Sequence, residues 1–600
     1  MKHSTESPFR NAGWTRRDSL AAAGLFLATV ALILWQNTQL AVLWDLSYVL
    51  DSAARIAAGQ LPYRDFPFAH APLTFLIQAA IIRLTGWVFF HHVLYAAAVG
   101  GSSSVVAWRI VLHTLWGRVE VAWAVALLLA APLTVLGIYC IFPLPSYDCD
   151  CAFSILVAIR LLQCLATNAG ATFGLGKSRK LLLGLAAGAA LCIPLFFKQN
   201  MGLPFLAFTL AVVAMLLVAQ AIGHGRAISL GQEFLVWLVV LAGAAATLLA
   251  TALLLHFTVG LGNYVHWTIK FASQRRLPAL HEMLAVYLDP NLLWTLPCIV
   301  AALLLLRSSL VKARWAQIAV LALLAAPFLF TLCSLLLYDD ADERGDCLLS
   351  LWPLLLILSA ALAFSRMFRL RRDRSLRPLL PVVLLVTING TLMSQQLWGS
   401  TYAIWPLLIL LIAEMIAFLA TFKLPAPASG VRVRTLAPVM AAVIAATLLV
   451  CGGVYTASEE RLSYARLPDG PVEHSTFPQL AGMAVAGPYL PDFEELLRYA
   501  AANIPFSDGL ILIPGEDPFY FVTGRVPQFP VLLFDASTDP YLPAEVVEEA
   551  RLHQIRWLIV KRELQIKEDP TPQREATLKA LLQDFTLVEK LHAYDVYRRR

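Results

Sequence analysis

Long apolar segments recur along this chain of 600 residues and restrict what it can fold into more than any other feature. Hydrophobic residues make up 59% of the sequence and charged residues only 14%, against roughly 25% charged residues in typical soluble domains. Since a helix needs about 20 mainly apolar residues to cross a membrane, we expect a polytopic α-helical membrane protein with about thirteen transmembrane helices. The expected spans lie near residues 20–42, 89–112, 119–140, 152–167, 181–197, 203–221, 233–257, 293–308, 316–337, 348–365, 379–394, 401–421 and 435–455.

The apolar run 72–86 decides the orientation of every later span. If this run lies along the membrane surface, the clusters of Lys and Arg between spans all fall on one side. These clusters include Arg16, Arg17, Arg118 and the stretches 176–180, 224–226, 307–314, 366–377 and 423–434. Basic clusters mark the cytoplasmic side, so we expect the N-terminus in the cytoplasm and the residues after 455 outside. The first apolar run lacks a small-residue cleavage site and is expected to remain as a helix.

Several classes of function are excluded by what the sequence lacks. The formal net charge of +6 does not indicate nucleic-acid binding, because the Lys and Arg residues lie in short clusters between apolar spans. The nine cysteines show no Cys-x-x-Cys pair and no zinc spacing. No Ser/His/Asp pattern, glycine-rich phosphate loop or Walker sequence is present, which argues against hydrolase and nucleotide-driven chemistry.

From about residue 456 the composition becomes that of a soluble domain. The apolar runs 509–513, 530–534 and 556–560 predict buried strands, and the stretches 543–554 and 574–585 predict amphipathic helices. We therefore expect two domains. Residues 1–455 would form the transmembrane domain and residues 456–600 a small extracytoplasmic α/β domain.

A polar segment directly after the first span carries the most informative carboxylates. It reads "DLSYVLDSAARIAAGQLPYRDFPFAHAPL", residues 45–73, and includes Asp45, Asp51 and Asp65. Asp45 and Tyr48 are three residues apart and share a helical face, whereas Asp51 lies about 120° away and has Arg55 at ion-pair spacing. Asp51 is therefore interpreted as structural. For Asp45, a catalytic carboxylate and an interfacial helix-end carboxylate are both open.

The second outer loop reads "FPLPSYDCDCAF" and places Asp148 and Asp150 just before a membrane helix. The helix dipole alone would favour carboxylates there. If the two loops converge, one carboxylate can act as general base while the other helps to hold a divalent cation or orient a phosphate.

Basic residues expected on the outer side depart from the positive-inside pattern and are candidates for binding an anionic substrate. They are Lys198, Lys270, Arg275, Arg276 and, in the loop "YDDADERGDC", Arg344. Lys and Arg suit a phosphate headgroup. Snorkelling at a helix end and a solvated loop face are the alternatives that account for them without a ligand.

The first outer loop resembles that of bacterial GT-C fold glycosyltransferases. The resemblance rests on Asp45 in its Asp-x-x-Tyr context, the stretch through "QLPYRDF" to Pro72, and the following apolar run that ends at Gly86. It is closest to the branch of aminoarabinose transferases, protein O-mannosyltransferases and RgtA/B/C/D-like proteins. The segment 515–525, "GEDPFYFVTGR", also resembles part of the outer domain of such enzymes, where it would close over the site, bind acceptor or act as a structural cap.

The resemblance implies a multi-pass enzyme of the bacterial inner membrane that transfers a sugar from a polyprenyl-phosphate donor to a lipid, glycan or protein acceptor by inverting displacement. It assigns the catalytic carboxylate to Asp45 and a second acidic position to Asp148 or Asp150. Tyr48 and Asp65 would contact substrate together with the outer basic residues. A divalent cation, Mg²⁺ or Mn²⁺, is left open, with Asp45 and Asp148 as its ligands.

Two other functions remain open at this stage. An O-antigen polymerase or ligase would also use outer basic residues on lipid-linked glycans, but it usually places its large loop between spans. A lipid or solute transporter, the non-enzymatic alternative, should show internal repeats and charged or broken segments at mid-membrane. This chain has its charges near the outer surface and its soluble part at the end.

Overall fold

The structure is a computed structural model of the chain. It describes residues 14–39, 41, 44–169, 177–223, 232–276, 279–338, 348–367, 380–392, 403–420, 436–462, 465–466, 470–535, 538–567 and 571–600.

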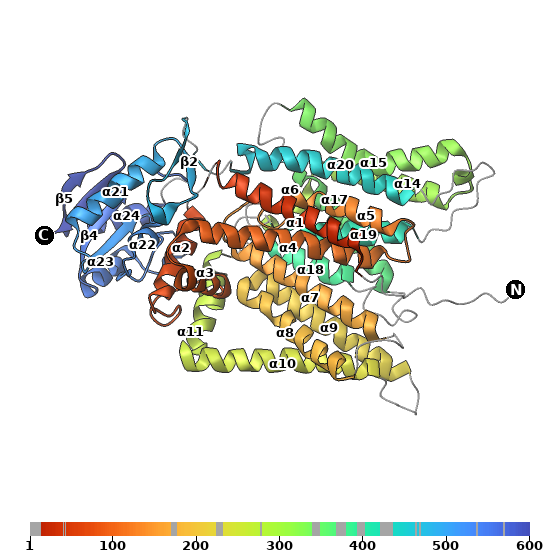
Figure 1. Ribbon diagram of the computed structural model, residues 1–600, viewed down its shortest axis with the longest axis horizontal. Helices are drawn as coiled ribbons and strands as arrows, with labels where there is room; N and C mark the ends of the chain where they lie inside the picture. Colours follow the sequence, from red (N-terminus) through yellow and green to blue (C-terminus); the bar gives the residue numbers. More distant parts are fainter. Residues whose placement is uncertain are drawn as a thin grey trace.

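Most of the chain forms a bundle of helices that run in roughly the same direction (Figure 1). The bundle contains α1 (Arg16–Gln36), α4 (Phe89–Leu115), α5 (Ala122–Ala130), α6 (Leu133–Leu136), α7 (Tyr147–Ala169), α8 (Lys177–Phe197), α9 (Gln199–Gly223), α10 (Gln232–Thr258), α14 (Leu292–Arg307), η3 (Ser309–Lys312), α15 (Arg314–Leu337), α17 (Leu351–Met367), α18 (Leu380–Thr391), α19 (Trp405–Leu419) and α20 (Leu436–Ala457). Within the described ranges, eight helices are long and apolar enough to cross a membrane. A bent pair, 280–288 with 292–307, makes a ninth if it is counted as one span. The remaining expected spans coincide with shorter apolar helices in the bundle, so the prediction of a multi-pass helical membrane protein is confirmed.

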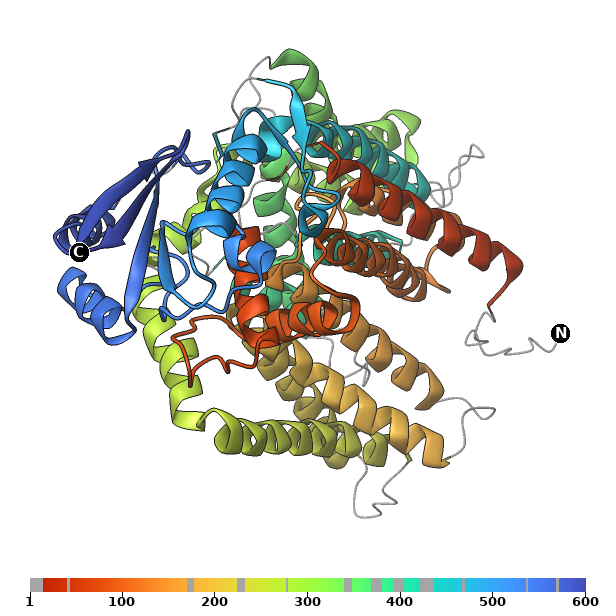
Figure 2. The same cartoon turned by 60° about the vertical axis from the view of Figure 1, so that its left-hand side comes forward.

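The two ends of the bundle differ (Figure 1). Residues 470–600 lie at one end, which we call the sheet end, and α1 begins at the opposite end, which we call the far end. Two helices, α2 (Trp44–Ala57) and α3 (Leu73–Thr85), lie at the sheet end between the bundle and residues 470–600 (Figures 1 and 2). With 13 residues, α3 is one of the shorter apolar helices, and it lies at the sheet end beside α2 (Figure 1). That residues 72–86 follow the membrane surface stays a prediction.

A chain of short helices follows α10 at the sheet end. It consists of α11 (Leu261–Val265), the π-helix η1 (His266–Phe271), α12 (Ala272–Arg276), α13 (Leu280–Leu284) and η2 (Ala285–Leu288). In Figure 1, α11 turns away from the axis of α10 and runs beside α2 and α3.

The C-terminal residues form a small α/β fold. A four-stranded sheet has the order β3 (Gly509–Ile513), β4 (Ile555–Lys561), β6 (Tyr594–Arg599) and β5 (Phe585–Lys590), with β3 and β4 parallel and the other neighbours antiparallel. Further elements are η7 (Glu459–Leu462), β1 (Val472–His474), η8 (Pro478–Leu480), β2 (Ala484–Ala486), α21 (Tyr489–Asn503), α22 (Phe519–Thr523), α23 (Pro543–Leu552) and α24 (Pro572–Leu581). Both expected amphipathic helices and the expected strands at 509–513 and 556–560 are confirmed.

The expected strand at 530–534 is wrong. This stretch is buried, with Val531 and Phe534 in a hydrophobic core and Leu533 against Trp44 and Ile566, but it has no strand pairing. Pro530 has no N–H to donate to a ladder, and its carbonyl oxygen accepts a hydrogen bond from Arg55 at 2.7 Å. An apolar run alone does not distinguish a buried strand from a buried irregular segment.

Hydrogen bonds across very long sequence separations tie α2 to the C-terminal fold. The carboxylate of Asp51 accepts from the backbone N–H groups of Phe521 at 2.7 Å and Tyr520 at 3.3 Å, at the start of α22. The hydroxyl of Ser47 donates to the carbonyl oxygen of Glu516 at 2.6 Å. Burial raises the pKa of Asp51 well above its usual range, and the two N–H donors oppose that rise. The segment 515–525 therefore contacts α2 through Glu516, Tyr520 and Phe521.

The expected ion pair between Asp51 and Arg55 is not formed, although both residues are described. Arg55 is buried, donates to the side chain of Gln60 and to Pro530, and lies 4.2 Å above the ring of Phe66. The spacing i, i+4 permits a pair on an isolated helix, but here each charge has other partners, Asp51 at the start of α22 and Arg55 at Pro530. The interpretation of Asp51 as structural agrees with its partners.

We expect Asp51→Ala to loosen the attachment of α2 to the C-terminal fold by about 1–3 kcal/mol, because two buried N–H groups lose their hydrogen-bond acceptor. The measurement is the thermal unfolding temperature of the purified protein in detergent, together with the rate of tryptic cleavage. Asp65→Ala is the matched control, since Asp65 is exposed and its carboxylate accepts from the neighbouring Arg64 at 2.8 Å and from the backbone N–H of Leu61 at 2.7 Å. An unfolding temperature equal to that of this control would contradict the docking role.

Candidate active site

Asp45 stands in the first turn of α2 with its side chain exposed at the sheet end. The residue before it, Trp44, is buried against Leu533 and Ile566, and the hydroxyl of Ser47 is bonded to the C-terminal fold. The backbone that carries Asp45 is thus fixed on both sides, while its carboxylate reaches solvent. Such a fixed and exposed carboxylate can accept a proton from a bound hydroxyl.

Tyr48 lies one turn after Asp45, on the same face of α2. Its ring packs on Phe68 at 6.1 Å and on Phe75 at 5.9 Å between centroids. His70 lies 5.2 Å from the same ring, and its Nδ1 is 3.3 Å from the hydroxyl oxygen of Tyr48. This aromatic group, with Tyr48, Phe68, His70 and Phe75, closes the first outer loop onto α2.

His70 also connects the first outer loop to the second. Its ring is 4.9 Å from that of Tyr147, the first residue of α7. The backbone of His70 is held by the hydroxyl of Tyr63, which donates to its carbonyl oxygen at 2.6 Å. Tyr63 itself adopts a left-handed backbone conformation with φ 70°, which costs about 1–2 kcal/mol in a non-glycine residue. Such a conformation persists where surrounding contacts fix it, as they do around a site.

Asp148 forms a buried ion pair with Lys198, the residue between α8 and α9. The ammonium of Lys198 also lies 5.4 Å from the centre of the Tyr147 ring. Both partners are less than one tenth exposed. A pair of this kind needs both charges, because removing either leaves an uncompensated buried ion.

Asp150 has a different environment, in which hydroxyl groups replace the counter-charge. Its carboxylate accepts hydrogen bonds from Thr74 at 2.7 Å, Tyr95 at 2.8 Å and Tyr139 at 2.7 Å. Tyr139 is the second tyrosine of the site in a left-handed conformation, with φ 66°. Thr74 belongs to α3 and Tyr95 to α4, so Asp150 holds the first and second outer loops against each other. The convergence of the two loops is present in the structure.

The described residues form no preformed cluster of ligands for the divalent cation expected at Asp45 and Asp148. The carboxylate of Asp148 is neutralised by the ammonium of Lys198, and that of Asp150 is saturated by three hydroxyl donors. Within the described ranges, no group of three or more His, Cys, Asp or Glu side chains could hold a metal ion. Mg²⁺ needs only one or two protein carboxylates, because waters and substrate phosphates supply its other ligands, so a cation at Asp45 and Asp148 stays a prediction.

The other candidate residues lie around this centre. Asp65 is exposed and paired with Arg64, which with its hydrogen bonds lowers the pKa of Asp65 against the opposing effect of burial. Lys270, in η1, and Arg275, in α12, are exposed at the sheet end. Burial raises the pKa of Asp539 to about 6, and nearby Arg275 opposes that rise, so Arg275 faces the C-terminal fold. The backbone of Arg276 ends α12, and Arg344 lies outside the described residues.

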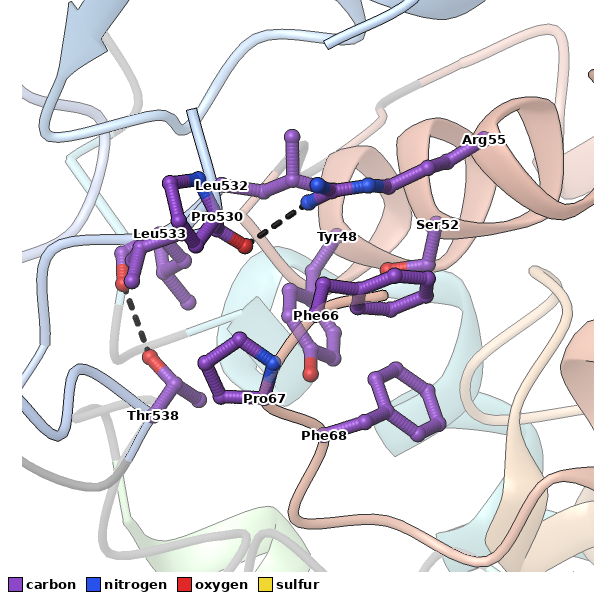
Figure 3. Close-up of a pocket in the computed structure, with 11 residues that line it drawn as sticks. Tyr48, Ser52, Arg55, Phe66, Pro67, Phe68, Pro530, Leu532, Leu533 and Thr538 are labelled. Carbon is purple, nitrogen blue, oxygen red and sulfur yellow. Dashed lines mark hydrogen bonds between the residues drawn. The ribbon is translucent and has the colours of Figure 1, made fainter. Parts of the chain in front are cut away.

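A hollow with an enclosed volume of about 10 Å³ lies beside Tyr48 where α2 meets the C-terminal fold (Figure 3). Figure 3 shows Tyr48, Ser52 and Arg55 of α2 on one wall and residues 530–533 with Thr538 on the other. Ligand sites usually enclose roughly 300–1,000 Å³. The hollow is therefore a seam between two packed parts of the molecule and is too small to hold a sugar and its lipid phosphate.

Sequence reasoning missed the residues that join the loops: His70, Thr74, Tyr95, Tyr139 and Tyr147. The sequence contains only a weak indication of these residues. His70 and Thr74 flank Pro72 in a polar segment that was already singled out, and Tyr147 precedes Asp148. Nothing in the sequence brings Tyr95, inside an apolar span, to Asp150.

No protein-family model matches the sequence, and no curated protein sequence matches it. Several solved structures are similar to the structure of this chain. The oligosaccharyltransferase of Archaeoglobus fulgidus, in complex with Zn and sulfate, matches with a TM-score of 0.48 and 13% identity over 90% of this chain and 68% of that chain. ArnT from Cupriavidus metallidurans matches with a TM-score of 0.41 and 12% identity when bound to undecaprenyl phosphate, over 96% of this chain and 97% of that chain. In the apo state, ArnT matches with a TM-score of 0.45 and 13% identity, over 96% and 98% of the two chains. These structural neighbours are GT-C fold membrane glycosyltransferases, the group that the first outer loop resembles.

Proposed function

We propose that this protein is an integral membrane glycosyltransferase that moves a sugar from a polyprenyl-phosphate donor to a hydroxyl of a lipid, glycan or protein acceptor by a single inverting displacement. One observation carries the proposal. The exposed carboxylate of Asp45 and the buried Lys198–Asp148 pair belong to two loops that meet at the sheet end through Tyr48, His70 and Tyr147. A base and a cation on opposite sides of one junction are what transfer from a lipid phosphate requires.

Each residue has a separate role in this scheme. Asp45 accepts the proton of the acceptor hydroxyl while that oxygen attacks C1 of the sugar. The bond from C1 to the phosphate oxygen breaks, and the lipid phosphate leaves with the electron pair. Lys198 neutralises the charge that develops on this phosphate, with Lys270, Arg275, Arg276 and Arg344 as further contacts for the donor. Asp148 orients Lys198, and Asp150 holds the two loops together.

The C-terminal part positions the base. In this proposal residues 1–455 form the transferase domain and residues 456–600 a second domain that fixes α2, through Asp51, Ser47 and Arg55. The domain also closes the side of the site on which Tyr48 lies, with Asp65 at its rim. Because α2 is packed on both sides, the second domain contributes to catalysis through the position of Asp45 without supplying a reacting group.

The sheet end faces the outside of a bacterial cytoplasmic membrane in this proposal, because basic clusters then lie inside. A reporter fusion tests this orientation. Alkaline phosphatase, which is active only outside, should be active when fused after residue 600 and inactive when fused after Arg307 at the far end of α14. The reverse pattern would place the site on the cytoplasmic side.

The activity is tested by transfer of labelled sugar from polyprenyl phosphate in membranes that contain or lack the full chain. Mass spectrometry of envelope glycolipids, glycans and proteins from the same cells identifies the acceptor. We expect a labelled product and a mass increment of one sugar that both depend on the protein. Envelope material of unchanged composition, together with the absence of turnover for every polyprenyl-linked sugar supplied, would contradict the proposal.

A further inference from the structure

A second cavity lies in the bundle itself, away from the site at the sheet end. Its enclosed volume is about 70 Å³, and its walls come from α4, α7, α9, α18 and α19. These helices run beside one another in Figure 1. Most of the wall is apolar, with Leu162, Phe205 and Val212 among the lining residues. This volume is well below the roughly 300–1,000 Å³ of sites that enclose a whole ligand, so the cavity can take only part of a larger molecule, and its apolar wall suits a stretch of alkyl chain.

Charged side chains close the cavity toward the far end. Glu414 is buried in α19 and binds Arg366 at 2.6 Å, while Arg118 approaches the same carboxylate oxygen at 3.7 Å. One arginine is enough to neutralise one glutamate. Arg118, which also lines the cavity and remains about one quarter exposed, adds a positive charge to this mouth. Among the described side chains, Arg118, Arg366 and Glu414 together carry one net positive charge at this mouth, which is complementary to a phosphodiester.

A buried hydroxyl on the cavity wall also lacks a partner. Thr209 is 2% exposed and lines the cavity, and its Oγ1 has no hydrogen-bond partner among the described residues. Nearly all buried hydroxyls in proteins are satisfied, so each exception calls for a partner from outside the chain. An ester carbonyl oxygen below a phosphate headgroup can accept this hydrogen bond.

We infer that this cavity binds one anionic phospholipid, with its phosphodiester at Arg118, its ester region at Thr209 and an acyl chain along the apolar wall. This site is separate from the proposed transfer reaction. If the far end faces the cytoplasm, the ligand comes from the inner leaflet, where basic pockets between helices select anionic lipids. Whichever side of the membrane the far end faces, the Arg366–Glu414 pair holds α17 to α19. A purely structural cluster would not need Arg118 in addition.

The test measures lipid binding to the purified full-length protein in detergent by native mass spectrometry. The probes are dioleoyl phosphatidylglycerol, the zwitterionic dioleoyl phosphatidylcholine, and inorganic phosphate. We expect phosphatidylglycerol to bind at least about tenfold more tightly than phosphatidylcholine, since one charge-assisted contact accounts for a factor of that size. Arg118→Gln should remove this preference, and Ala166→Trp, which fills the cavity, should weaken both lipids by about tenfold or more.

Matched controls separate the cavity from general effects. Arg307→Gln removes a charge at the same end, and Ala250→Trp adds bulk on an exposed face of α10; both should leave binding unchanged. Thr209→Val keeps the side-chain shape and should fold normally, yet lower phosphatidylglycerol affinity by about fivefold. Equal binding of the two lipids, or normal binding by a folded Ala166→Trp variant, would overturn the inference. Full displacement of phosphatidylglycerol by inorganic phosphate would reduce the site to one for free anions.

Discussion

Asp45→Asn is expected to lower sugar transfer by about 10² to 10⁴ while the protein keeps its fold. The substitution preserves the size of the side chain and removes the basic oxygen. Asp45 is exposed, and the neighbouring anchors of α2, Trp44 and Ser47, do not depend on its charge. The measurement is the initial rate of labelled-sugar transfer in membranes at equal expression, with the unfolding temperature of each purified variant as a check.

The matched control is Asp65→Asn, another exposed carboxylate in the same loop. Its partner Arg64 lies on the surface, and surface pairs contribute at most about 1 kcal/mol. We expect this variant to retain transfer within a few-fold of the unchanged protein. Near-normal transfer by Asp45→Asn would remove the proposed base, and a severe loss in Asp65→Asn would move the search to that residue.

Lys198→Met is expected to have the second large effect, on stability and on transfer together. It leaves the buried carboxylate of Asp148 without its counter-charge, which costs about 3–5 kcal/mol. It also removes the cation that neutralises the leaving phosphate. Thermal unfolding in detergent measures the first effect, and the KM for the lipid-linked donor measures the second.

The double variant Lys198→Met, Asp148→Leu separates these two contributions. Replacing both members of a buried ion pair by apolar residues of similar size is often neutral or stabilising, so the unfolding temperature should recover. Transfer should stay low, because no cation remains for the phosphate. Asp148→Asn alone should be destabilised while it keeps donor binding better than Lys198→Met. Recovery of transfer in the double variant would show that the pair serves only the fold.

The bundle could be predicted from the sequence because a membrane span is a local property. About 20 apolar residues make a span wherever they stand, and the short α3 was separated from true spans by the charges that follow later in the chain. The strand expected at 530–534 failed for the opposite reason. The carbonyl oxygen of Pro530 accepts its hydrogen bond from Arg55 of α2. The run of apolar residues gives no indication of this distant contact.

The candidate site was predicted in part. The outer carboxylates could be found because charge beside a membrane helix is costly and stands out. The environment of each individual carboxylate could not be predicted. Asp148 and Asp150 are two residues apart and look equivalent in sequence, yet one binds an ammonium and the other three hydroxyls. The donors lie on separate helices, and only the packing of α3, α4 and α7 decides which carboxylate each one reaches.

The docking of α2 on the C-terminal fold also has a consequence for biosynthesis. Ser47 and Asp51 find their partners 469 and 470 residues later in the chain. At the usual translation rate of about 5–20 residues per second, the helix that carries Asp45 waits roughly 25–95 seconds for them. During that time its carboxylate at position 51 has no α22 to cap, and the side of the helix that packs on the C-terminal fold is uncovered. The nascent protein therefore assembles its candidate site last, when the ribosome has nearly finished, and a chain cut short before β3 would carry every membrane helix and still lack the support that fixes the proposed base.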